Sequence, residues 1–152
     1  MPAEVKNDGL EPQYFQSLVE NLHLTPLYRE QGILPLVLGK GYTVFTISGS
    51  KTVFNSSGVI HGGVQMTCAD TAMGSAIRAS GIKTSTIQQT SCFLAPCPMN
   101  ARIICTGRIV KSGKNMFFCQ AEITADDKPV STFEAVFANL GPETITRPFI
   151  PE

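Results

Sequence analysis

Asp70 is the residue of this chain whose type and position most strongly suggest chemistry. Between Gly58 and Ile77 it is the only side chain that carries a full charge at neutral pH. It falls within an expected helix that starts near Gly62, too late to cap that helix. Because a buried carboxylate is costly without a partner, we consider Asp70 a candidate catalytic group. The alternative is an Asp satisfied by a neighbouring hydroxyl group or by solvent at the helix edge.

The residues before this helix could stabilise an oxyanion. A turn from Asn55 to Gly58 is followed by His61, Gly62 and Gly63 at the expected helix start. Free amides at a helix N-terminus point outward at the positive end of the helix dipole. Glycine lets a developing oxyanion or a polarised carbonyl approach such amides closely. A helix start that only needs a tight backbone would have the same sequence.

The spacing of Gly62 and Asp70 predicts an active site shared between subunits. Eight residues separate them, which is roughly 12 Å along a helix with a rise of about 1.5 Å per residue. One reacting carbon cannot contact both. If both act on the same bond, the amide comes from one subunit and the carboxylate from another, so we expect a homodimer, and pairing of dimers into a tetramer stays open.

A compound pattern gives the chain a family resemblance. It resembles the signature of hot-dog thioesterases of the phenylacetate-degradation (PaaI-like) branch, and the similarity spans roughly residues 34–141. The signature is carried by Asn55-x2-Gly58-x2-His61-Gly62-Gly63-x6-Asp70-x3-Gly74, and Thr86, Phe93 and Pro96 resemble the next family block. The resemblance implies an α+β hot-dog fold, in which an antiparallel sheet wraps around a long central helix and an N-terminal helix is added.

The resemblance also implies an acyl-CoA thioesterase and a role for each matching residue. Gly62 would supply the amide that polarises the carbonyl, while Asn55 would help to bind the thioester or the attacking water. His61 would hold the loop and the helix start in place. From the partner subunit, Asp70 would act as general base or nucleophile, with Thr86 positioning water beside it.

Further residues are expected to bind the substrate. Gly63 adds a second amide at the helix start, and Met66 and Met73 share the helix face of Asp70 and could line an acyl pocket. Methionines at helical spacing are otherwise core residues. The basic turn Lys111-Ser112-Gly113-Lys114 could bind the phosphates of coenzyme A, or it is an ordinary solvated hairpin. Coenzyme A is part of the substrate, and neither a cofactor nor a metal is expected.

The elements that position these residues follow from hydrophobic periodicity. A first amphipathic helix is predicted over Glu11–Leu24. A second, central helix is predicted from Gly62 to about Ser80, and its small residues allow a sheet to approach it closely. Strands are predicted over residues 33–38, 42–48, 84–94, 101–110, 115–124 and 130–140. Short turns separate the last four strands and predict an antiparallel meander, and residues 147–152 are expected to form an extended tail.

Composition limits the classes of function. At 152 residues the chain has the size of one domain. Twelve basic and twelve acidic residues cancel, so no strong field attracts nucleic acid or an anionic membrane. The first nine residues contain no apolar run that would form a secretory signal. The five cysteines show no CxxC pair, which favours reduced thiols in a cytoplasmic protein.

Two other functions are compatible with the same fold. A non-catalytic acyl-CoA sensor is possible because a fold does not determine a function, although no DNA-binding segment accompanies it. A hydratase would need a His paired with an acidic residue, and His61 and Asp70 are separated along the helix. The sequence does not distinguish aromatic, medium or long acyl groups, nor direct attack by water from a nucleophilic carboxylate.

Overall fold

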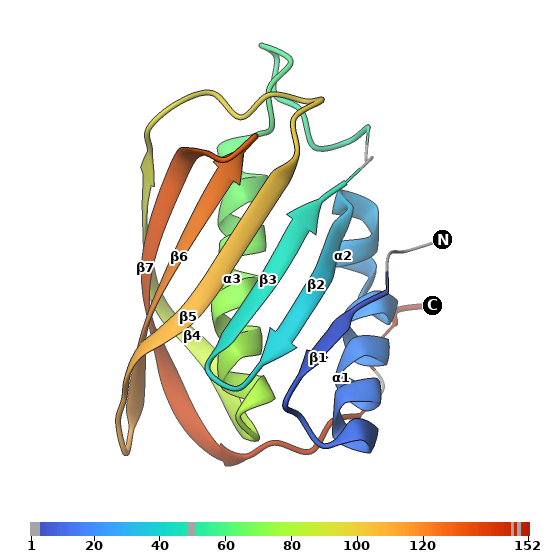
Figure 1. Ribbon diagram of the computed structural model, residues 1–152, viewed down its shortest axis with the longest axis vertical. Coiled ribbons are helices and arrows are strands. Elements are labelled where there is room, and N and C mark those ends of the chain that lie inside the picture. The colour runs from blue at the N-terminus through green and yellow to red at the C-terminus, as the bar shows by residue number, and fades with distance from the viewer. Residues whose placement is uncertain (1–3, 49–50, 147, 149) are drawn as a thin grey trace.

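The computed structural model describes residues 4–48, 51–146, 148 and 150–152. A long helix, α3, lies against one face of a seven-stranded sheet, with α1 and α2 beside it (Figure 1). The elements in chain order are β1 (Lys6–Asp8), α1 (Pro12–Leu24), α2 (Pro26–Gln31), β2 (Ile33–Gly39), β3 (Tyr42–Ile47), α3 (Gly62–Ala79), β4 (Ile82–Phe93), β5 (Ile103–Ser112), β6 (Met116–Ala125) and β7 (Lys128–Pro142). The chain is therefore an α+β protein, as predicted.

Both predicted helices are confirmed. The side chain of Glu11 caps α1 by accepting hydrogen bonds from the backbone N–H groups of Gln13 and Tyr14, and α3 ends at Ala79, one residue short of the prediction. Two short elements, β1 and α2, were not predicted. With three and six residues, they are too short for a hydrophobic period to reveal them.

The strand order corrects the predicted meander. The sheet runs β1-β2-β3-β5-β6-β7-β4, so β5, β6 and β7 do form a meander but β4 does not pair with β5. Instead β4 pairs antiparallel with β7 and lies at the edge of the sheet. The connection after β4 crosses the end of the sheet near the start of α3, where Ile60 donates a backbone hydrogen bond to Cys97.

Two predicted turns are shorter than expected. Lys111 and Ser112 continue β5, and the backbone N–H of Gly113 bonds to the carbonyl of Met116 to close the hairpin. Between β6 and β7 the turn consists of Asp126 and Asp127, both with positive φ angles, 47° and 66°. Asp tolerates this left-handed conformation better than most residues, and a two-residue loop of this type suits a twisted hairpin.

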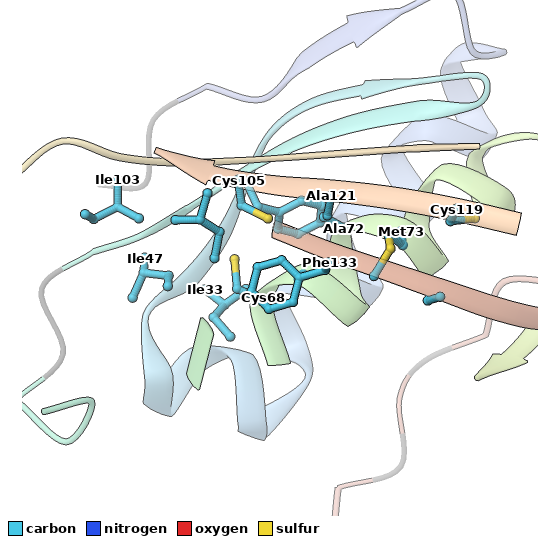
Figure 2. Packing of buried hydrophobic residues seen from close by; sticks show 14 of the residues in the cluster. Ile33, Ile47, Cys68, Ala72, Met73, Ile103, Cys105, Cys119, Ala121 and Phe133 are labelled. Atoms are coloured by element: carbon cyan, nitrogen blue, oxygen red, sulfur yellow. The ribbon is translucent and has the colours of Figure 1, made fainter. Parts of the chain in front are cut away.

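The core forms where α3 packs on the sheet. Figure 2 shows Cys68, Ala72 and Met73 of α3 among side chains of the strands, and all three are fully buried. At the closest approach, a Cβ atom on Gly107 of β5 would lie 2.6 Å from the backbone carbonyl carbon of Ala72. The hydroxyl of Thr43 donates to the Ala72 carbonyl at 2.7 Å. These contacts fix the position of α3.

Three further findings concern the helices, the cysteines and the chain ends. No helix in the described part of the chain is both long and apolar enough to cross a membrane. Cys92 is exposed, the other four cysteines are buried, and all five are free thiols. The tail predicted over residues 147–152 includes 147 and 149, which lie outside the described residues, and residues 1–3 of the N-terminus also lie outside them.

Candidate active site

The structure brings Asp70 and Thr86 together. Asp70 lies on the third turn of α3, and Thr86 lies on the neighbouring strand β4. The Thr86 hydroxyl donates a hydrogen bond of 2.6 Å to Oδ1 of Asp70. Because β4 is the edge strand, the carboxylate lies at the margin of the sheet and not in the sealed core.

The surroundings of Asp70 shift its protonation. Partial burial of the side chain raises the pKa of Asp70 above its ordinary value, while the hydrogen bond from Thr86 lowers it. Desolvation penalises the charged form and a donated hydrogen bond favours it. The burial effect is the larger of the two. Asp70 is thus a more basic carboxylate than one in water, and such groups are typical of catalytic sites.

The start of α3 leaves one amide open. His61 is the N-cap, and its Nδ1 atom accepts a hydrogen bond of 2.8 Å from the Gly63 N–H. The carbonyl of His61 accepts the next two amides, those of Val64 and Gln65. The Gly62 N–H has no hydrogen-bond partner among the described residues. Gly62 is therefore free to bind a carbonyl oxygen, whereas the expected amide of Gly63 is occupied, which corrects that prediction.

Phe93, at the end of β4, lies against Gly62. A Cβ atom on Gly62 would be 3.1 Å from Cζ of Phe93, so a larger residue there would displace the ring. Phe93 also packs edge-on against Phe133, with ring centres 6.1 Å apart. The ring thus shapes the approach to the Gly62 amide, a contact that only the strand pairing could reveal.

Asn55 organises the turn before α3. Its side-chain oxygen accepts hydrogen bonds from the N–H groups of Ser57, at 2.9 Å, and Val59, at 3.3 Å. Gly58 completes the turn with a φ angle of +77°, a conformation that favours glycine. With its oxygen committed to the turn, Asn55 can offer a ligand its side-chain N–H groups, and its expected role at the thioester stays a prediction.

Within one chain, Gly62 and Asp70 do not meet. Both lie on α3, and eight residues of continuous helix separate them, which corresponds to roughly 12 Å. A thioester held by the Gly62 amide therefore lies out of reach of Asp70 in the same chain. The geometry agrees with the separation expected from the sequence.

A groove opens beside Asp70 and has a volume of about 350 Å³. Asp70, Gly74 and Arg78, spaced one helical turn apart on α3, line one side of it, and Lys83 and Thr84 of β4 line the other. A larger hollow of about 710 Å³ on the outer face of the sheet includes Arg108 and Glu134 but not Asp70. We assign the candidate site to the smaller groove because it contains the partly buried carboxylate of Asp70.

The remaining expected substrate residues are dispersed. Met66 is 37% exposed on α3 and stays a candidate for the acyl pocket. Met73 is fully buried in the core cluster, so it does not line an open pocket, and the prediction for it is wrong. Helix periodicity places both on one side of α3, but strands pack over Met73 (Figure 2). The exposed turn from Lys111 to Lys114 lies at the opposite end of the sheet from the start of α3 (Figure 1).

Sequence reasoning missed the polar end of the groove. Arg78 bonds through Nε to Glu143 at 3.2 Å and through a terminal nitrogen to Asn21 at 3.0 Å. These partners are far apart in the sequence, and only the position of Arg78, two turns after Asp70, signalled that it shares the same face. The described residues contain no group of three or more His, Cys, Asp or Glu side chains that could hold a metal.

Comparison with known proteins decides the family. The profile of the thioesterase superfamily matches residues 57–132, half of the chain, which include the helix start, Asp70 and Thr86. The chain belongs to the thioesterase superfamily. None of the curated proteins compared matches its sequence.

Solved structures show that this superfamily member has the hot-dog fold. The E. coli PaaI protein of the phenylacetic acid degradation operon is 22% identical, with a TM-score of 0.79 over 88% of this chain and 98% of that one. A conserved protein of Pseudomonas aeruginosa is 23% identical, with a TM-score of 0.73 over 78% and 97%. A hypothetical thioesterase of Streptococcus pneumoniae, solved with coenzyme A, is 19% identical, with a TM-score of 0.70 over 74% and 91%.

Proposed function

We propose that this superfamily member is an acyl-CoA thioesterase that uses Asp70 as its catalytic carboxylate. The observation that carries the proposal is the hydrogen bond of 2.6 Å between Thr86 and the partly buried Asp70 at the edge of the sheet. A carboxylate with a raised pKa, open to a groove and oriented by a hydroxyl group, can remove a proton from water. Superfamily membership supports thioester hydrolysis as the reaction.

The reaction needs an activated water and a stabilised oxyanion. Water attacks the thioester carbon as its proton passes to Asp70, and the carbonyl oxygen gains charge against the Gly62 N–H. The C–S bond then breaks, and the thiolate leaves without a strong acid. In the alternative route Asp70 itself attacks, and water hydrolyses the resulting anhydride. Neither route uses a metal or a resident cofactor.

A homodimer completes the site in this proposal. Strand β4, 12 residues long, has one neighbour, β7, and leaves its other edge unpaired within the described chain. It exposes Ile87 by 56% and Phe93 by 48%. A long edge strand with exposed apolar side chains readily pairs with another strand. Pairing of two copies along β4 would bring Asp70 of one chain towards the Gly62 end of the other.

Coenzyme A is the proposed carrier of the acyl group. The related S. pneumoniae protein was solved with coenzyme A, and its fold is shared by this chain. The exposed lysines of the turn from Lys111 to Lys114 stay the proposed contact for the nucleotide phosphates. Phosphates interact favourably with such a cluster of ammonium groups.

Replacement of the carboxylate is the direct test. Asp70→Asn should lower kcat for an acyl-CoA by about a hundredfold or more, because general-base catalysis is lost. The free energy of unfolding should not fall, since the raised pKa means that ionised Asp70 is a cost to the folded state above the unfolded pKa. The assay follows free coenzyme A with a thiol reagent. Asp127→Asn, at an exposed ion pair, is the matched control and should retain full activity.

Mixing two inactive variants tests the shared site. Gly62→Pro removes the N–H at a first helical position that suits the backbone of proline, and its ring pushes the Phe93 side chain aside. Heterodimers of Asp70→Asn and Gly62→Pro chains contain one intact site, so random mixing should restore about a quarter of the wild-type activity. A site built within one chain would regain none. A protein that binds acyl-CoA but hydrolyses none of a panel would instead be the non-catalytic binder.

A further inference from the structure

The groove beside Asp70 continues past the carboxylate toward a cationic end. Asp70, Gly74 and Arg78 follow one another along α3, so Arg78 is roughly 12 Å from the reacting end. Lys83, at the start of β4, faces the same groove. This geometry gives the groove an acidic end at the proposed chemistry and a basic end about two helical turns away.

The lining of the groove is polar between these two ends. Thr71 and Ser75 of α3, Thr84 and Ser85 of β4 and Tyr28 of α2 contribute hydroxyl-bearing side chains. The apolar contribution comes mainly from Phe137. A groove that takes a long alkyl chain is lined by aliphatic and aromatic side chains, because the transfer of methylene groups from water drives binding. This lining favours a polar acyl group.

The charges at the far end leave one cation uncompensated. Glu143 is paired with Arg78 at 3.2 Å, and their side chains are 10% and 22% exposed. Asn21 fixes a second nitrogen of the same guanidinium group. Lys83 is exposed, and no ion pair to it is found in the described part of the chain. The far end therefore has a net positive charge carried by a flexible ammonium group.

We propose that this groove receives the acyl part of the substrate and selects acyl groups that end in a carboxylate, which Lys83 binds. The proposal rests on the proposed thioesterase function. A terminal carboxylate lies far from Asp70 when it reaches Lys83, so the two negative charges are kept apart. An acyl group that ends in methyl leaves the ammonium group without a partner and gains little from the hydroxyl lining.

The test compares acyl-CoA substrates of equal chain length that end in methyl, hydroxyl or carboxylate, in a series of lengths. The wild-type protein should show its highest kcat/KM for a carboxylate-terminated acyl-CoA. Lys83→Glu should lower that kcat/KM by about tenfold or more, the value of a lost hydrogen bond between charged groups. For the methyl-terminated substrate, kcat/KM should change by less than about twofold. Lys83→Gln should give an intermediate loss, and Lys128→Glu, an exposed lysine outside the groove, is the charge-matched control.

Pantetheine thioesters of the same acids distinguish the acyl carboxylate from the phosphates of coenzyme A as the anion. They lack the nucleotide, so the effect of Lys83→Glu should persist with them. If the effect disappears, Lys83 binds the nucleotide and the proposal is wrong. Equal or better hydrolysis of methyl-terminated substrates, or a ratio unchanged in Lys83→Glu, also overturns it while leaving the thioesterase function intact. Hydrolysis of no thioester in the panel would overturn both.

Discussion

The two sides of helix α3 contain similar small residues but have different tasks. On the side that faces the sheet, Ala72 and Met73 are fully buried, and the backbone of β5 at Gly107 lies against them. On the side that faces the edge strand, Asp70 holds a charge next to Thr86 at a groove. A helix fixed tightly on one side can hold a carboxylate in a defined place on the other. Substitutions on the packed side should therefore change stability first, and those on the edge side should change activity first.

Gly107→Ala should have the largest effect, because it disrupts the packing of α3 against β5. The new methyl group would lie 2.6 Å from the backbone carbonyl carbon of Ala72 and 2.7 Å from the backbone nitrogen of Met73. Backbone atoms of a helix cannot rotate away as a side chain can, so α3 or β5 must move. We expect a loss of about 3 kcal/mol in the free energy of unfolding, measured by denaturant titration. A loss below about 0.5 kcal/mol would show that α3 is not held at this contact.

Periodicity was sufficient to predict the elements on the packed side. The small residues of α3 and the alternating strands β5, β6 and β7 are repeated patterns, and each reflects burial on one face. Strand order could not be predicted in the same way. The pairing of β4 with β7 depends on contacts between residues far apart in the sequence, which hydrophobic periodicity does not specify.

The candidate site shows the same division. Spacing and family resemblance selected Asp70 and Thr86, and the structure places them in contact. The occupied amide of Gly63 and the burial of Met73 were not predictable, because the first depends on the ring orientation of His61 and the second on which strands pack over α3. The sequence alone predicts on which part of α3 these residues lie, but not their hydrogen bonds or their burial.

Thr86→Val tests the side of α3 that faces the edge strand. Valine keeps the shape of threonine and removes the hydroxyl that bonds to Asp70. That bond lowers the pKa of Asp70, so its loss raises the pKa further. Since catalysis requires the ionised carboxylate, the acid limb of the pH profile of kcat/KM should move to higher pH. The loss of a hydrogen bond to a charged group should also reduce kcat by about tenfold.

Thr86→Ser is the matched control for this substitution. Serine retains the hydroxyl group, so the acid limb should stay near its wild-type position and most of the activity should remain. Thr86→Ser should leave the free energy of unfolding nearly unchanged. Thr86→Val should lower it modestly at neutral pH, because a pKa raised further makes ionised Asp70 a larger cost to the folded state. If Thr86→Val leaves the pH profile unmoved, the hydroxyl does not act on the carboxylate that titrates in catalysis.

Gly74→Ala gives the smallest effect and the most direct contrast with Gly107→Ala. The added methyl group is the same, but on this side it would lie 3.4 Å from Cε1 of Phe137, an ordinary contact. Glycine in the middle of a helix costs roughly 0.5–1 kcal/mol relative to alanine, so the variant should be more stable by about that amount, measured in the same titration. The methyl group also narrows the groove one turn beyond Asp70, so kcat/KM should fall while the fold is strengthened. A variant that loses stability instead would show that the edge side of α3 is packed as tightly as the side against the sheet.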